Sequence, residues 1–168
     1  NGVTYDALTG KITVPAGVSS FAVTVPTVDD TIVEPNETLT LTVSDKSGVG
    51  TIIDNDLATV VKVDPVNPTT GSDSVVEGKD LTYTVTLSAT TNKPTTFDFK
   101  LGAPGDTAST ADYSAPKFNN GVTYDALTGK ITVPAGVSSF AVTVPTVDDT
   151  IVEPNETLTL TVSDKSGV

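Results

Sequence analysis

The feature that most constrains the fold of this chain is a long internal repeat. Residues 1–49 recur without a single change at residues 120–168. The two copies begin 119 residues apart, a spacing that suits one β-sandwich domain and is much longer than a solenoid unit. We therefore expect tandem repeats of 119 residues. Residues 1–56 would be the C-terminal part of one repeat with its closing strand and junction, and residues 57–168 would be the next repeat without its closing strand.

Alternating apolar and polar residues predict that the repeat consists almost entirely of β-strands. This period of two is typical of strands with one buried face, and no segment has a helical period. The alternating apolar positions are Leu81, Tyr83, Val85, Leu87, Phe97, Phe99, Leu101, Ile131, Val133, Phe140, Val142, Val144, Leu158, Leu160 and Val162, with Phe21, Val23, Val25, Leu39, Leu41 and Val43 as counterparts of the last six. Val60–Val63 predicts an opening strand and Gly50–Ile53 a closing strand. About seven short strands per repeat indicate an all-β fold, an antiparallel Greek-key β-sandwich of the immunoglobulin-like type.

The composition excludes several classes of function. The chain has 21 acidic and 9 basic residues and a formal net charge of -12, which disfavours contact with nucleic acid or anionic membranes. No apolar run is long enough for insertion into a membrane. Histidine and cysteine are absent, so Ser–His and Cys–His nucleophiles and disulfides are impossible. An acidic hydrolase with paired carboxylates is the enzymatic alternative. Since the chain has no tryptophan for a sugar cleft, we expect no enzyme.

The acidic residues are gathered in a few predicted loops. One cluster contains Asp148, Asp149, Glu153 and Glu156, and its identical copy contains Asp29, Asp30, Glu34 and Glu37. Further acidic residues are Asp54 and Asp56 after the closing strand, Glu77 before Gly78, and Asp112 before Tyr113. Taken singly, each of these short motifs is explained as a solvated turn.

Taken together, the acidic loops predict calcium binding. Calcium takes about six to eight oxygen ligands from loops that can bend around it. The adjacent aspartates supply two carboxylates, and the proline-containing loop returns two glutamates to the same end of the sandwich. Two carboxylates ~5 Å apart repel each other by ~3 kcal/mol at an effective dielectric constant of ~20. Such a cluster is therefore costly unless a cation neutralises it.

The order of these motifs along the repeat resembles that of a Calx-beta domain. The motifs are Val76-Glu77-Gly78, Ala111-Asp112-Tyr113, Asp148-Asp149 with Glu153 and Glu156, and Gly50–Asp56. The resemblance implies calcium ligands at Glu77, Asp112, Asp148, Asp149, Glu153 and Glu156, with Asp54 and Asp56 serving the junction between domains. The chain departs from the family at Asn55, where the family's junction has aspartate, because an asparagine offers only a neutral oxygen.

Tandem identical copies of this composition resemble the extender region of giant bacterial RTX adhesins. The resemblance implies an extracellular module at the bacterial cell surface whose partners are neighbouring identical repeats in the same chain. Calcium at the junctions would stiffen the array and project an adhesive domain. One alternative is a binding module whose exposed threonine face contacts a glycan, ice or a protein. Another is a calcium-sensing Calx-beta regulatory domain, although identical copies suit reach better than sensing.

The chain contains the C-terminal (rear) half of the expected repeat twice, at residues 1–56 and 120–168. It contains the N-terminal (front) half once, at residues 57–118. We expect residues 120–168 to complete residues 57–118, because the short Asp56–Ala58 link cannot carry residues 1–56 back across the sandwich. Each residue spans at most ~3.6 Å, and the gap between opposite poles is much longer. Both pieces are then expected to have exposed strand edges, which a neighbouring chain could complete by intermolecular strand addition.

Overall fold

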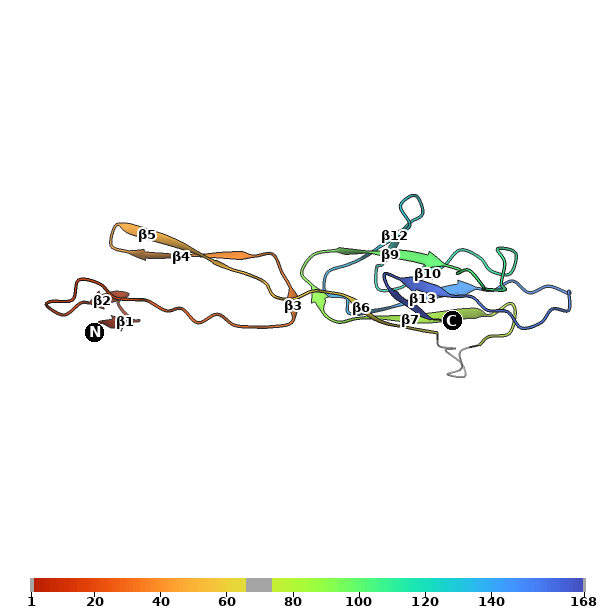
Figure 1. The fold of residues 1–168 in the computed structure, drawn as a ribbon, viewed down its shortest axis with the longest axis horizontal. Helices are drawn as coiled ribbons and strands as arrows, with labels where there is room; N and C mark the ends of the chain where they lie inside the picture. The colour runs from red at the N-terminus through yellow and green to blue at the C-terminus, as the bar shows by residue number, and fades with distance from the viewer. Residues whose placement is uncertain (1, 66–73, 168) are drawn as a thin grey trace.

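The computed structural model describes residues 2–65 and 74–167 as an elongated, all-β molecule (Figure 1). Asn1, the first residue of one identical segment, and Val168, the last residue of the other, lie outside the described residues. The strands are β1 (Thr4–Asp6), β2 (Lys11–Thr13), β3 (Ile32–Val33), β4 (Glu37–Val43), β5 (Lys46–Ile52), β6 (Val60–Pro65), β7 (Asp80–Leu87), β8 (Thr90–Thr91), β9 (Thr95–Leu101), β10 (Lys117–Phe118), β11 (Thr123–Asp125), β12 (Lys130–Val133), β13 (Ser139–Pro145), β14 (Leu160–Val162) and β15 (Lys165–Gly167). Within this described part of the chain, no helix is long and apolar enough to cross a membrane.

Two sheets form a sandwich from β6 onward. The first sheet has the order β10-β13-β7-β6, and the second has the order β11-β12-β9-β14-β15. Neighbouring strands in both sheets run antiparallel. The buried apolar side chains of the two sheets form one core. The predicted antiparallel β-sandwich is therefore confirmed.

The core follows the predicted alternation of apolar and polar residues. In β13, Phe140 and Val142 are buried, and the residues that flank them in the strand are more exposed. Val142 lies opposite Tyr83 of β7 in the antiparallel ladder. The Tyr83 hydroxyl donates a hydrogen bond to the carbonyl of Leu158, next to the other sheet, at 2.5 Å. This bond satisfies the polar atom of a fully buried ring, and so the tyrosine can sit in the core.

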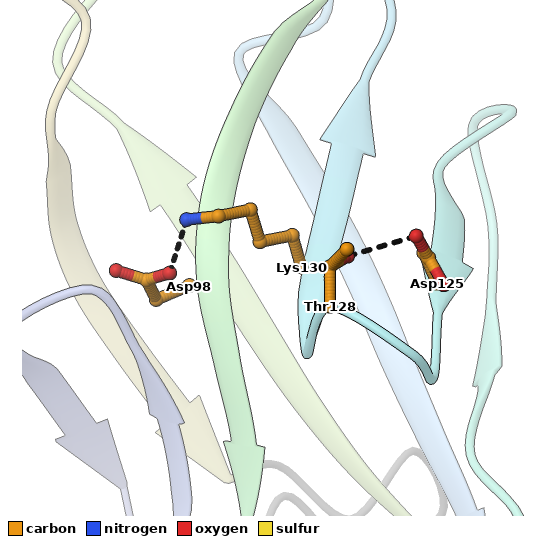
Figure 2. Close-up of polar contacts among 4 residues, drawn as sticks. All are labelled: Asp98, Asp125, Thr128 and Lys130. Carbon is orange, nitrogen blue, oxygen red and sulfur yellow. Dashed lines mark hydrogen bonds and ion pairs between the residues drawn. The ribbon is translucent and has the colours of Figure 1, made fainter.

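The β11–β12 hairpin combines a local turn contact with a longer-range link to β9 (Figure 2). Thr128 Oγ1 donates to Asp125 Oδ2 at 2.8 Å inside the turn. Lys130 Nζ lies 2.5 Å from Asp98 Oδ1 on β9, and the same two residues are opposite each other in the β12–β9 ladder. The turn is thus closed by its own sequence, whereas the link to the sandwich needs β9.

The N-terminal part lies beyond one end of the sandwich and consists mainly of the β1–β2 and β4–β5 hairpins (Figure 1). The strand predicted from Phe21, Val23 and Val25 is wrong, because residues 21–26 form none. Their identical copy is β13, which pairs with β7 on one side and with β10 on the other. No described strand pairs with residues 21–26. A strand without a hydrogen-bonding neighbour is not stable in water.

The closing strand begins earlier than predicted. β5 pairs with β4 from Val43↔Lys46 to Glu37↔Ile52, so its first residue is Lys46 rather than Gly50. The turn between the two strands contains only Ser44 and Asp45, and the chain therefore returns at once. In the second copy, β15 likewise pairs with β14 from Lys165 onward. β15 thus corresponds to the first three residues of β5.

The two parts of the chain meet through a short parallel strand pair. β3 pairs with β8 through Ile32↔Thr90 and Val33↔Thr91, and Figure 1 shows β3 where the N-terminal part joins the sandwich. β8 belongs to the segment between β7 and β9. This contact therefore connects the N-terminal part of the chain to the sandwich.

Candidate metal centre

Six acidic residues line one pocket of about 780 Å³ on the sandwich. They come from the turn before β7, the loop between β9 and β10, and the loop between β13 and β14. The six are Glu77, Asp112, Asp148, Asp149, Glu153 and Glu156. These are the positions at which the family resemblance implies calcium ligands, so the fold brings three loops that are distant in sequence to one place.

Asp112 is held by a tight turn beside the aspartate pair. The Ser109 amide donates to Asp112 Oδ2 at 2.5 Å, and the Asp112 amide donates to the Ser109 carbonyl at 3.1 Å. The Asp112 carbonyl accepts a hydrogen bond from the amide of Val147 at 2.8 Å. Because Val147 precedes Asp148, this bond fixes Asp112 next to the loop that follows β13.

A glycine allows the Glu77 turn to approach that loop. Gly78 has a φ of 75°, in the left-handed region that residues with a Cβ rarely adopt. A Cβ atom placed on Gly78 would lie 2.8 Å from Cβ of Asp148, closer than two such atoms can pack. The predicted motif Val76-Glu77-Gly78 therefore depends on its glycine for two reasons, backbone conformation and space.

Three carboxylates of the pocket converge. Asp112, Glu153 and Glu156 can each place one oxygen within 4.8 Å of the others. Loss of solvent, followed by the charges of Asp112, Glu153 and Glu77, raises the pKa of Glu156. Hydrogen bonds from Ser109 lower the pKa of Asp112. Clustered carboxylate oxygens are the hard ligands that calcium prefers, and this donor set therefore fits the ion.

The remaining six predicted ligands line a second, smaller pocket of about 70 Å³ at the end of the N-terminal part. They are Asp29, Asp30, Glu34, Glu37, Asp54 and Asp56. Loss of solvent, and then the charges of Asp54, Asp29 and Asp30, raises the pKa of Asp56. The loop that contains Asp29 and Glu37 thus shares its pocket with the Asp-Asn-Asp segment. The identical loop of the sandwich shares its pocket with Glu77 and Asp112 instead.

Hydrogen bonds tie the Asp-Asn-Asp segment to the loop. Asp54 Oδ2 accepts from the Glu34 amide at 3.2 Å, and the Asp54 amide donates to Asn36 Oδ1 at 3.1 Å. Asn55 Nδ2 donates to Asp29 Oδ1 at 3.2 Å. A third aspartate could not donate this bond, so the asparagine at position 55 holds a carboxylate of the pocket in place.

Sequence reasoning missed the residues that position the acidic groups. Ser109 precedes Asp112 by three residues, a spacing typical of a turn closed by its own side chain, which could have identified it. Asn36 Oδ1 accepts a hydrogen bond from the Asp54 amide. The copy of Asn36 in the second segment, Asn155, lines the larger pocket. Both asparagines lie inside the acidic motif, and their neutral amide oxygens are also acceptable calcium ligands.

The sequence also matches a known protein-family model. A model of the Calx-beta domain matches residues 1–66 and 106–168, which together make up more than half of the chain. Comparisons with curated proteins and with solved structures find no match. Calx-beta domains bind calcium and act as regulatory or structural modules, which is consistent with a non-catalytic role. The chain belongs to the Calx-beta domain family.

Proposed function

We propose that this chain is a calcium-stabilised extender module of a long RTX adhesin on a bacterial cell surface. The observation that carries the proposal is the placement of two acidic pockets in a chain that contains two identical segments, residues 1–49 and 120–168. One pocket lies within the sandwich, and the other contains Asp54–Asp56, the segment that precedes the sandwich. A cation in each would act on the repeat and on the junction separately.

Within the sandwich, Asp112, Glu153 and Glu156 would hold the ion, with Glu77, Asp148 and Asp149 around them. When bound, calcium supplies the positive charge that offsets the repulsion among these carboxylates. Ser109 keeps Asp112 oriented and ionised. The three loops are then held together by one group of ligands, and this would stabilise the end of the sandwich.

At the junction, Asp54 and Asp56 would share an ion with the loop that contains Asp29, Asp30, Glu34 and Glu37. This loop also contains β3, which pairs with the next repeat. An ion that fixes this loop to the Asp54–Asp56 linker would therefore restrict bending between repeats. Without calcium, repulsion among the carboxylates would loosen the junction.

A calcium-sensing regulatory domain is the second candidate, and membership of the Calx-beta family favours it. Sensing requires a conformational change that a partner can detect, whereas extension requires only that the junction stiffens. The identity of residues 1–49 and 120–168 favours extension, because equal units add length without dividing roles. Binding to a glycan array or to ice would instead favour the third candidate, a ligand-binding β-sandwich.

Thermal melts with calcium and with chelator test the proposal. Calcium at ~100 times its dissociation constant should stabilise the fold by ~2.7 kcal/mol per site. Glu156→Gln should remove most of the gain for the sandwich, whereas the matched Glu37→Gln should leave that gain intact. Magnesium should stabilise less, since it demands a tight octahedral shell. Superimposed melting curves with calcium and chelator would contradict calcium binding.

Small-angle scattering separates the extender from the sensor. In calcium, the chain should have a longer maximum dimension and a narrower spread of shapes than in chelator. Calcium binding that leaves the shape of the junction unchanged would favour the regulatory alternative.

A further inference from the structure

The contact between the N-terminal part and the sandwich also includes main-chain hydrogen bonds and an apolar side chain. β3 pairs with β8, and the Asn92 amide donates to the Val33 carbonyl at 3.1 Å. Asn92 Nδ2 also lies 3.4 Å from Glu34 Oε1. The Val33 side chain packs against the core of the sandwich. Main-chain bonds and an apolar side chain thus hold the β3 segment against the sandwich, and we call the β8 surface that receives it the seat.

The seat is held in place by hydrogen bonds within the sandwich. Thr91, opposite Val33, is buried, and its carbonyl accepts a hydrogen bond from the Gly136 amide at 2.9 Å. Thr91 Oγ1 donates to the carbonyl of Lys93. These bonds hold β8 in place from its own side, so the edge that faces β3 is a fixed surface rather than a loose loop.

The identical segment in the second copy has no such partner among the described residues. Ile151 is 65% exposed and Val152 is 100% exposed, whereas Ile32 is 39% exposed and Val33 is partly buried. The start of both segments is the same, because Asp30 accepts from the Ile32 amide and Asp149 accepts from the Ile151 amide. The segment is therefore shaped locally before it meets a partner.

We propose that Ile151–Val152 is a docking site for the Thr90–Asn92 edge of a further repeat of this sequence. The occupant is inferred from the chain itself, since the same residues in the same loop are already seated on that edge at β3. A following repeat would pair its Thr90–Thr91 with Ile151–Val152 and cover Val152 with its core. The inference rests on the proposed function, to which it adds the surface by which extender repeats join.

The arrangement also connects the apolar seat with the acidic pocket. Glu34 follows Val33 directly, and its amide donates to Asp54 in the linker. Glu153 is the counterpart of Glu34 and belongs to the converging carboxylates of the sandwich. Each docking segment thus continues into a residue of an acidic pocket, so an ion there and a docked repeat would order the same loop.

Val33→Asp tests the seat in the full chain, with Val152→Asp as the matched control. Val33→Asp should speed hydrogen exchange of the Asn92 amide by about tenfold or more, because its acceptor is displaced. Val152→Asp should leave that rate unchanged. The amides of β7 and β13 report whether the sandwich remains folded, and the milder Val33→Thr should give a smaller effect in the same direction. Equal rates in the parent chain and Val33→Asp would overturn the seat.

A lengthened chain, with residues 50–168 added again after Val168, tests the docking site itself. There, Val152→Asp should speed exchange of the Asn92 amide in the added repeat by about tenfold, as measured by NMR on a segmentally labelled chain. No change would overturn the proposal. Thermal melts and exchange measurements in calcium and in chelator separate the two ideas. If calcium leaves the melting curve unchanged while Val33→Asp still speeds exchange of the Asn92 amide, only calcium stabilisation is contradicted. If calcium raises the melting temperature while the substitutions leave that exchange rate unchanged, only docking is contradicted.

Discussion

Residues 1–49 and 120–168 share one sequence but have different structures. Both copies form the first hairpin, with Tyr5↔Ile12 in β1–β2 and Tyr124↔Ile131 in β11–β12. Both also form the last hairpin, as β4–β5 and as β14–β15. The strand between the two hairpins exists only as β13. The hairpins are therefore encoded locally, whereas the middle strand requires a partner from elsewhere in the chain.

Burial separates the two copies further. Leu41 is 42% exposed, and its counterpart Leu160 is fully buried; Val25 is 53% exposed, and Val144 is fully buried. Leu160 lies opposite Leu101 of β9, and Val144 lies opposite Leu81 of β7. Both partners come from residues 80–101, which lie outside the two identical segments. The same apolar pattern thus predicts a core but builds one only where the second half of that core is present.

The electrostatics of the first hairpin turn, in contrast, are the same in both copies. The side-chain hydrogen bond from Thr9, and then the Leu8 amide, lowers the pKa of Asp6. The corresponding bonds from Thr128 and Leu127 lower the pKa of Asp125. A turn closed by neighbours in sequence has the same chemistry whether or not it packs against a sandwich.

The largest expected difference between the copies comes from truncating the matched leucines. Leu160→Ala removes a fully buried side chain and should lower the free energy of unfolding by about 2–5 kcal/mol. Leu41→Ala should change it by no more than about 0.5 kcal/mol, because Leu41 is already partly in solvent. Urea unfolding of the sandwich measures both. Equal losses would mean that residues 1–49 compete with their copy for the front half.

A smaller difference should appear in the pH dependence of stability without calcium. The pKa of Glu156 is raised above its ordinary value of 4.5, so the folded state binds its proton more tightly than the unfolded state. The free energy of unfolding should therefore fall as the pH rises from 4.5 through the raised pKa, and it should recover on acidification. Calcium should oppose this loss, because it binds the ionised form.

Glu156→Gln provides the control for that prediction. Urea unfolding in chelator, at a series of pH values from 4.5 to neutrality, should give a shallower dependence for Glu156→Gln than for the parent chain. Identical slopes would show that Asp112, Glu153 and Glu77 do not act on Glu156 as the geometry indicates. The other copy has no described counterpart of Asp112, and so this effect belongs to the sandwich.

Much of this architecture could be predicted from the sequence because it depends on short-range patterns. Alternation located the strands that contain Tyr83, Phe97 and Phe140, since the period of two requires no knowledge of partners. The acidic motifs indicated the residues of both pockets, because charge repulsion makes unexplained clusters costly. The fold then brought Glu77, Asp112 and Glu156 together.

The errors and omissions have a common physical cause. The predicted strand at residues 21–26 fails because a strand is stable only in a ladder, and the sequence alone does not say which copy obtains the partner. The pairing of β3 with β8 was not predicted, since a two-residue strand leaves no periodic signal. Asn92 was missed because its contribution is a main-chain amide, which any residue except proline could supply.

The smallest expected difference concerns the lysine that links the β11–β12 hairpin to β9 (Figure 2). Lys130 pairs with Asp98, but both side chains are largely exposed, and such pairs contribute roughly 0.2–1 kcal/mol. Lys130→Ala should therefore lower the free energy of unfolding within that range, and Lys11→Ala should not, since the N-terminal hairpin lies outside the sheets of the sandwich. A double-mutant cycle with Asp98→Asn isolates the pair from the packing of the lysine stem. A coupling energy near zero would leave the β12–β9 ladder as the link that distinguishes this hairpin from its copy.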